Sequence, residues 1–179
     1  MKDDYLINYQ EVKDLNLESF IRIIKSKKGR KLSELKVKDL TYHNGEIIYP
    51  GEGVYIFRDT KNDNRIILVG KVTSMSFTER ISKHFDVRRN AWFNRLLKIV
   101  WENKNPNINA DNIKDENLIE ISKSVFSRMD IVLINFIYEH NKSRKKINRI
   151  EKLLRASTKT LNKFKTIKIN DFGIIIDKY

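Results

Sequence analysis

The sequence contains no cysteine in its 179 residues. Without thiols the chain can form no disulfide, hold no metal through thiolate and use no cysteine as a nucleophile. It also lacks an apolar run near the roughly 20 residues that span a membrane. The start, Met1-Lys2-Asp3-Asp4, is charged and has no apolar stretch of the kind found in signal peptides. We therefore expect an intracellular, cytoplasmic protein that does not associate with membranes.

Acidic residues are scarce relative to basic ones. Asp and Glu number 23, Lys and Arg number 36, and the formal net charge is +13. An excess of this size attracts polyanions and speeds their capture. Nucleic acid is the commonest such partner, and its phosphates release counterions when basic residues bind them. The alternative is a compositional bias toward Lys that only covers solvated faces, and charge alone leaves both interpretations open.

The chain length fits one domain with an extension. We predict an N-terminal extension over residues 1–50, which can serve as a DNA-contacting arm, and a main domain over residues 51–179. Turn signals at Asn44-Gly45 and Pro50-Gly51 mark the boundary between the two. The apolar residues within 20–24 indicate a helix inside the extension.

Hydrophobic periodicity and turn residues predict the elements of the main domain. The expected elements are a hairpin of strands 53–57 and 65–70, a helix capped by Ser76 with Glu79, an amphipathic helix over 90–102, a loop over 103–116, a helix over 118–126, a buried strand over 131–138, a helix over 143–156 and a terminal strand over 174–176. This order predicts an α/β (α+β) fold in which a small, mostly antiparallel three-stranded sheet is flanked by helices. The residues expected in its core are Val54, Ile56, Ile67, Val69, Leu133 and Phe136.

Residues that could take part in catalysis follow the same order along the chain. They are Gly53-Val54-Tyr55 on the first strand, Leu68-Val69-Gly70-Lys71 at the end of the second, Arg80 and His84 on the first helix, Glu151 on the late helix, and Asn162 after it. Each alone is a weak signal, because each has an ordinary structural role on a strand or a helix surface. Their order and spacing together resemble the GIY-YIG endonucleases over about residues 51–165.

This resemblance implies a metal-dependent endonuclease that hydrolyses phosphodiester bonds in DNA, with Mg²⁺ or Mn²⁺ as its cofactor. Tyr55 stands at the position of the general base, and Glu151 at the position that holds one divalent metal. Arg80 stands where the family stabilises the transition state. Lys71 and Asn162 belong to the implied catalytic set, and Asn162 is expected to orient the metal-bound Glu151 or the phosphate.

Each of these residue types can supply something that the reaction requires. Phosphodiester hydrolysis needs an activated water, a Lewis acid and neutralised charge at phosphorus. The phenolate of Tyr55 can take the proton of water, and Lys71 and Arg80 are expected to lower its pKa from the usual value of about 10. Glu151 offers the oxygen ligand that Mg²⁺ prefers. Arg80 can fork onto two phosphate oxygens, and His84 lies one helical turn from it on the same face, as in restriction-type members.

One position departs from the family pattern, because Leu68 stands where the second motif normally begins with Tyr. A leucine side chain cannot hydrogen-bond to water or phosphate. Two alternatives therefore stand beside the DNA endonuclease: a catalytically inactive nucleic-acid-binding module of the same fold, and a nuclease that acts on RNA. Duplex DNA is the expected partner, RNA is the alternative, and a homodimer is left open. Target choice is expected to rest on residues 1–50 and 103–116.

Overall fold

The computed structural model describes residues 5–43, 46–47, 52–91, 93–136 and 143–162. Its helices are α1 (Tyr9–Val12), α2 (Leu17–Ser26), α3 (Phe77–Ser82), α4 (Arg95–Lys104), α5 (Asp115–Arg128) and α6 (Ser143–Ser157). Its strands are β1 (Leu6–Asn8), β2 (Arg30–Lys31), β3 (Tyr42–His43), β4 (Glu46–Ile47), β5 (Gly53–Asp59), β6 (Arg65–Val72) and β7 (Met129–Asn135). Short 3₁₀ helices are η1 (Leu32–Glu34), η2 (Val37–Leu40), η3 (Lys83–Phe85) and η4 (Ala110–Asn112).

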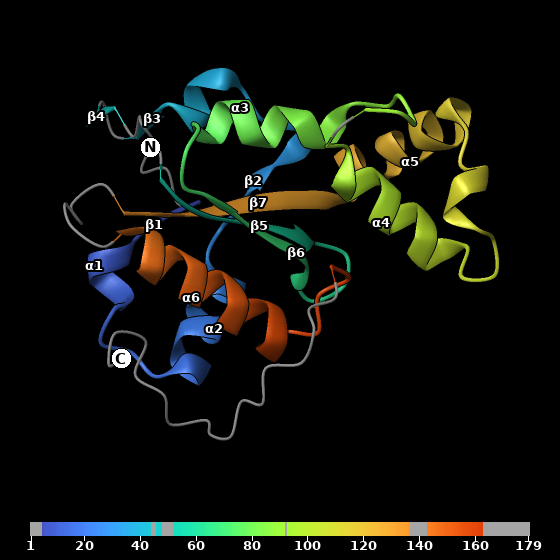
Figure 1. Ribbon diagram of the computed structural model, residues 1–179. Helices are drawn as coiled ribbons and strands as arrows, with labels where there is room; N and C mark the ends of the chain where they lie inside the picture. Colours follow the sequence, from blue (N-terminus) through green and yellow to red (C-terminus); the bar gives the residue numbers. More distant parts are fainter. Residues whose placement is uncertain (1–4, 44–45, 48–51, 92, 137–142, 163–179) are drawn as a thin grey trace.

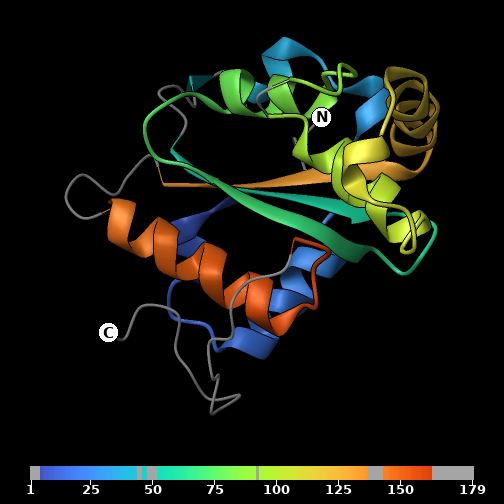
Figure 2. The same cartoon turned by 45° about the vertical axis from the view of Figure 1, so that its right-hand side comes forward.

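The architecture is α/β, with a mixed sheet between two layers of helices (Figure 1). α3, α4 and α5 cover one face, and α1, α2 and α6 cover the other, as the turned view also shows (Figure 2). Each layer encloses its own apolar cluster, with Leu97 and Val125 in one and Phe20 and Ile150 in the other. The core residues predicted from the sequence are all buried. In the described part of the chain, no helix combines the length and apolarity needed to cross a bilayer.

The sheet is larger than predicted. Its strands run in the order β1-β7-β5-β6, and β2 also pairs with β7. β1 is parallel to β7 and the other pairs are antiparallel, so the prediction of three mostly antiparallel strands is wrong in size and the sheet is mixed. Because every residue of β7 is buried, both of its edges need hydrogen-bond partners. β5 fills one edge, and β1 and β2 fill the other with strands too short to show a period in the sequence.

The segment predicted as an N-terminal extension supplies β1, β2 and α2 to this same sheet and core. Phe20 and Ile24 of α2 are fully buried against the sheet. Arg58 of β5 forms a buried ion pair with Asp130 of β7 and donates to the carbonyl of Ile24 at the end of α2. Residues 5–31 are therefore packed into the main domain, and their contact with DNA stays a prediction.

The predicted hairpin is confirmed as β5 and β6. Tyr55 lies opposite Gly70 in the antiparallel register. Asp63 and Asn64 close the hairpin in left-handed conformations with φ of 47° and 49°, which Asp and Asn tolerate better than most residues. Side chains alternate faces along a strand, so Lys71, the residue after Gly70, points to the opposite face from Tyr55.

Helix starts follow local hydrogen bonds. Ser76 caps α3 as predicted, since its hydroxyl accepts the N–H of Glu79 at 3.1 Å. The helix predicted over 90–102 begins later, at Arg95. Asn94, the residue just before this start, donates its side-chain amide to the carbonyl of Arg88 at 2.6 Å.

Other boundaries shift by smaller amounts. The helices predicted over 118–126 and 143–156 are confirmed as α5 and α6, and the predicted strand 131–138 begins earlier as β7. The predicted loop 103–116 is shorter, because α4 extends into it, η4 interrupts it and α5 begins before its end. The predicted strand 174–176, residues 137–138 and the turn residues 44–45 and 50–51 lie outside the described residues.

Candidate active site

A pocket of about 130 Å³ opens at the outer edge of β6, the last strand of the sheet. Side chains from both faces of the sheet meet there, with α3 on one side of the edge and α6 on the other (Figure 1). We call it the edge pocket. Its lining residues are Tyr55, Leu68, Val69, Gly70, Lys71, Arg80, His84, Phe93, Arg95, Glu151, Arg155 and Asn162.

The edge pocket contains all six residues that the sequence predicts to be catalytic. These residues come from separate elements: Tyr55 from β5, Lys71 from β6, Arg80 from α3, His84 from η3, Glu151 from α6, and Asn162 from the segment after α6. Leu68, at the departing position, also lines the pocket and is buried. The fold therefore brings residues that are up to about a hundred positions apart to one place.

Tyr55 reaches the edge pocket across Gly70. The two residues are cross-strand partners, and a Cβ atom at position 70 would overlap the phenol ring and the hydroxyl of Tyr55. The glycine leaves room for the ring to lie across the backbone of β6. Gly70 therefore has a steric role in placing the phenol hydroxyl at the sheet edge.

The hydroxyl of Tyr55 lies 2.8 Å from Nε2 of His84. The other ring nitrogen, Nδ1, accepts a hydrogen bond from the backbone N–H of Leu96 at 3.2 Å. A neutral imidazole that accepts at Nδ1 carries its proton on Nε2. His84 therefore donates to the Tyr55 oxygen, which leaves the hydroxyl proton of Tyr55 for a partner in the pocket.

Burial keeps His84 neutral. The ring is 0% exposed, and burial lowers the pKa of His84 to about 3, with the positive charges of Arg80 and Arg95 adding to the effect. At neutral pH the ring is thus a fixed hydrogen-bond donor toward Tyr55. The sequence predicts His84 as a catalytic group beside Arg80, and the structure places its ring in hydrogen-bond contact with the phenol of Tyr55.

Burial raises the pKa of Tyr55 to about 12. The carboxylate of Glu151 adds to the rise, whereas Arg80 and Arg95 oppose it. The predicted lowering of this pKa by Lys71 and Arg80 is therefore wrong in its net direction, because desolvation outweighs the nearby cations. Lys71 is not among the charges that act on the phenol, and it points to the other face of the sheet.

Glu151 on α6 is held by two basic side chains. Arg155 donates from Nη1 to Oε1 at 2.8 Å, and Nζ of Lys71 lies 3.8 Å from Oε2. Lys71 also donates to Oδ1 of Asn148. These partners offset the cost of burying a carboxylate that is only 5% exposed.

Asn162 covers the edge of β6. Its Nδ2 donates to the carbonyl of Val69 at 2.7 Å, and its Oδ1 accepts the N–H of Val69 at 3.4 Å. The backbone carbonyl of Asn162 accepts two hydrogen bonds from Arg155. Asn162 is therefore connected to Glu151 through its backbone carbonyl and Arg155, while its side-chain amide is hydrogen-bonded to the backbone of β6.

Arg80 lies flat on Phe93, with its guanidinium carbon 3.5 Å from the ring centroid. This stacking fixes the plane of the guanidinium, whose N–H donors lie in that plane. Its Nε is buried and has no hydrogen-bond partner among the residues that the structure describes. A buried donor without a partner is costly in a stable protein, so this atom marks a place where a ligand acceptor is expected.

Sequence reasoning missed several residues of this site. Asn148 and Arg155 stand three before and four after Glu151, which places all three on one stripe of α6. That spacing could have identified them once Glu151 was chosen. Phe93 and Arg95 could not be found in this way, because the helix that contains Arg95 was predicted to begin five residues too early.

The edge pocket is strongly basic. Lys71, Arg80, Arg95 and Arg155 face a single carboxylate, Glu151. This balance suits a phosphate.

The described residues hold no group of three or more His, Cys, Asp or Glu side chains arranged for a metal. The one carboxylate still fits a hydrated Mg²⁺, which often binds through one or two carboxylates with water and substrate phosphate completing its shell. Oε2 of Glu151 is the available oxygen, because Arg155 donates to Oε1 and Nζ of Lys71 lies 3.8 Å from Oε2, beyond hydrogen-bond distance.

No protein-family model matches this chain, and no curated protein or solved structure shows significant similarity to it. The geometry of the edge pocket is therefore the ground on which a function can be argued.

Proposed function

We propose that this protein is a metal-dependent endonuclease that hydrolyses phosphodiester bonds in DNA, with the edge pocket as its active site. The observation that carries this proposal is the meeting of the Tyr55 phenol, the unsatisfied Nε of Arg80 and the lone carboxylate of Glu151 in an otherwise basic pocket. These are the groups that water activation, charge neutralisation and cation binding require at one phosphorus. The net charge of +13 adds attraction for the polyanion at long range.

Arg80 binds the non-bridging oxygens of the scissile phosphate. Its plane is held by Phe93, so little freedom is lost when the guanidinium forks onto two oxygens. The charge that accumulates on these oxygens in the transition state strengthens the same hydrogen bonds. Arg95 adds a second positive charge on the same side of the pocket.

Tyr55 takes the proton of the attacking water. As the water oxygen bonds to phosphorus, the bond from phosphorus to the leaving sugar oxygen breaks, and that oxygen takes a proton from solvent. Only the phenolate can accept the first proton, and a pKa of about 12 makes this form a small fraction at neutral pH. His84 donates to the same oxygen, which favours the phenolate and fixes its direction.

Glu151 would hold the divalent cation through Oε2. When bound, Mg²⁺ or Mn²⁺ supplies Lewis-acid polarisation of the phosphate. Arg155 and Lys71 keep the carboxylate directed to the pocket. Because basic side chains surround Glu151, this carboxylate would hold a cation more firmly when a phosphate is also bound in the pocket.

A catalytically inactive nucleic-acid-binding module is the second candidate, and Leu68 is the observation that favours it. This side chain is buried at the pocket wall, where the family carries its second phenol. Tyr55 is consequently the one phenol that lines the edge pocket among the described residues. A nuclease acting on RNA has the same chemistry at phosphorus and stays an alternative substrate choice.

Incubation with supercoiled plasmid and Mg²⁺ separates the first two candidates. Nicking by the wild type supports the endonuclease, whereas tight binding without nicking, with Mg²⁺ or with Mn²⁺, supports the binding module. Parallel reactions with RNA of matched length test the substrate choice. DNA affinity that falls steeply with added salt is expected in every case, because binding begins with phosphate contacts.

A further inference from the structure

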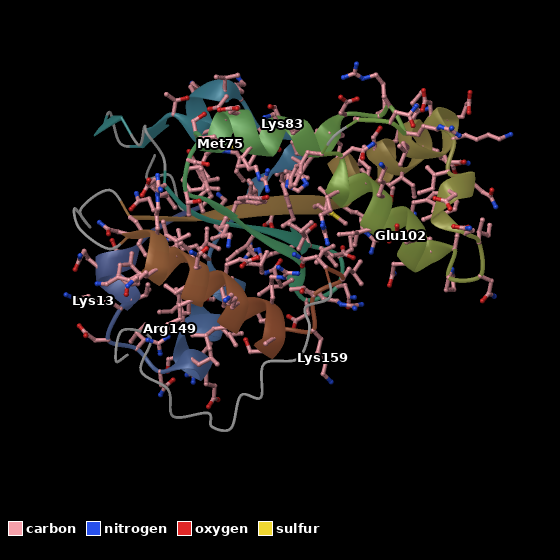
Figure 3. All side chains as sticks on the ribbon, viewed as in Figure 1. Lys13, Met75, Lys83, Glu102, Arg149 and Lys159 are labelled. Carbon is pink, nitrogen blue, oxygen red and sulfur yellow. The ribbon has the colours of Figure 1, made fainter. Side chains whose placement is uncertain are left out.

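A second, larger hollow opens beside the edge pocket, between α4 and the residues that follow α6. Its volume is about 610 Å³, which lies in the range of ligand-binding pockets. We call it the α4 groove. Its walls are Ile99, Glu102 and Asn103 of α4 on one side and residues 159–162 on the other. Figure 3 labels Glu102 and Lys159, one from each wall.

The α4 groove is continuous with the edge pocket, because Arg95 and Asn162 line both. Arg95 is exposed at the start of α4, and its charge acts on both Tyr55 and His84. A strand whose scissile phosphate lies beside Tyr55 therefore meets Arg95 next and the α4 groove after it. The groove is placed to receive whatever is covalently attached to that phosphate.

The chemistry of the α4 groove suits a nucleobase. Ile99, Pro106 and Leu161 offer apolar surface on which a base can lie. Glu102 and Asn103 bring a carboxylate and an amide, the groups that pair with donors and acceptors on base edges. The negative charge of Glu102 disfavours a phosphate next to this side chain. Two cations also line the groove: Arg95, which borders the edge pocket, and Lys159, which is exposed.

We propose that the α4 groove binds the nucleotide next to the scissile phosphate, with its base between α4 and residues 159–162. Arg95 and Lys159 then face the phosphates on either side of that base. This inference rests on the proposed phosphodiesterase function of the edge pocket. A base can enter such a groove only when it lies outside the duplex stack. The substrate class is therefore DNA with an unpaired or opened nucleotide at the cleavage site.

The first test is an NMR titration of the ¹⁵N-labelled full chain with thymidine 3′,5′-bisphosphate, beside a titration with inorganic phosphate. The bisphosphate is expected to shift the amide signals of Glu102, Asn103 and Thr160 as well as those of Gly70 and Lys71. Inorganic phosphate is expected to shift only the signals of the edge pocket. Bisphosphate shifts confined to the edge pocket overturn the groove proposal and leave the proposed function standing.

The second test blocks the groove with a matched pair of variants. Asn103→Trp places a large ring in the α4 groove, and Asn107→Trp makes the same change at an exposed position that does not line it. Asn103→Trp is expected to weaken bisphosphate binding about tenfold while leaving phosphate binding unchanged, and Asn107→Trp is expected to change neither. Equal bisphosphate affinity in the two variants contradicts the proposal.

The two proposals fail in different ways. If neither phosphate nor bisphosphate perturbs Gly70 and Lys71, and plasmid is not nicked, the edge pocket is not an active site and both proposals fall. If the wild type nicks DNA, the substrate preference decides the groove proposal. Faster cleavage of a duplex with an unpaired nucleotide than of the fully paired duplex supports it, and equal rates for the two substrates overturn it.

Discussion

His84 donates its Nε2–H to the hydroxyl of Tyr55, because the backbone N–H of Leu96 occupies its Nδ1. The tautomer of the ring is thus set by the start of α4, far along the chain from the strand that carries the phenol. The phenol in turn reaches the pocket only because Gly70 has no side chain. The position of the proposed base therefore depends on the hydrogen bond from His84 and on the space left by the absent side chain of Gly70, and a substitution can remove either one separately.

Acid is expected to destabilise the fold through His84. Its pKa is lowered from 6.5 to about 3 by burial. At a pH between these two values, the imidazole is protonated in the unfolded chain and neutral in the folded protein. Stability is therefore lost as the pH falls below about 6.5, by up to about 1.4 kcal/mol per pH unit, and is retained above it. Urea unfolding of the wild type and His84→Gln at pH 7 and pH 4.5 measures this effect, and the variant is expected to lose less stability. The nearby Asp86 contributes little to the difference between pH 7 and pH 4.5. Its pKa is lowered from 3.8 to about 2, so its titration in both the folded and the unfolded chain lies below this range. Identical pH dependence in both proteins would count against a buried neutral His84.

Cleavage is expected to rise with pH well above neutrality. The pKa of Tyr55 is raised to about 12 by burial, so the phenolate fraction grows about tenfold per pH unit below that value. The logarithm of kcat/KM is expected to increase with a slope of about one between about pH 7 and pH 10. Rates on a labelled oligonucleotide across this range provide the measurement. A plateau that begins near pH 7 would mean that the base is another group.

Gly70→Ala is expected to impair cleavage more than binding. The added methyl group overlaps the Tyr55 ring, so the hydroxyl must leave its place beside His84. We expect a rate loss on the order of 10²-fold, within the range of general-base contributions, with little change in DNA affinity. Ser74→Ala, at an exposed position just after β6, is the matched control. Wild-type rates in Gly70→Ala would show that the placement of Tyr55 is not critical.

The buried pair of Arg58 and Asp130 is expected to hold the N-terminal segment on the sheet. Both carboxylate oxygens of Asp130 accept from Arg58, which also donates to the carbonyl of Ile24. Arg58→Met leaves a buried carboxylate without its partner and is expected to cost about 3–5 kcal/mol in the free energy of unfolding. Arg65→Met, at an exposed position on β6, serves as the control. A loss below about 1 kcal/mol in urea unfolding would mean that the pair contributes little.

The sequence predicts the parts of this fold that depend on local pattern. The hairpin, the Ser76 cap and the helices α5 and α6 follow from periodicity and capping. The strands β1 and β2 could not be predicted, since their pairing is dictated by the buried edge of β7. The same limit applies to the site. The ordered motif predicts which residues meet, but the face on which each lies depends on the strand register.

The electrostatics of the site could not be obtained from residue types. Charge counting around Tyr55 favoured a lowered pKa, because Lys71 and Arg80 are close in the sequence pattern. Burial reverses that direction, and burial is a property of the packed sheet edge rather than of the motif. The effect of Arg95 on the pKa of Tyr55 was also missed, because the sequence predicted that the helix containing Arg95 begins at residue 90 rather than at Arg95.

Nicking of supercoiled plasmid by the wild type, Tyr55→Phe and Glu151→Gln, with Mg²⁺ and with chelator, tests the central claim most directly. Glu120→Gln, at an exposed position on α5, controls for the loss of one carboxylate. The wild type and Glu120→Gln are expected to nick only with the metal, and Tyr55→Phe is expected to be slower by about 10²–10⁴-fold. Glu151→Gln is expected to bind DNA without nicking it, since a hard cation needs an anionic oxygen. Nicking at the wild-type rate by Tyr55→Phe or Glu151→Gln, or a wild type that binds plasmid tightly and never nicks it, would contradict the account.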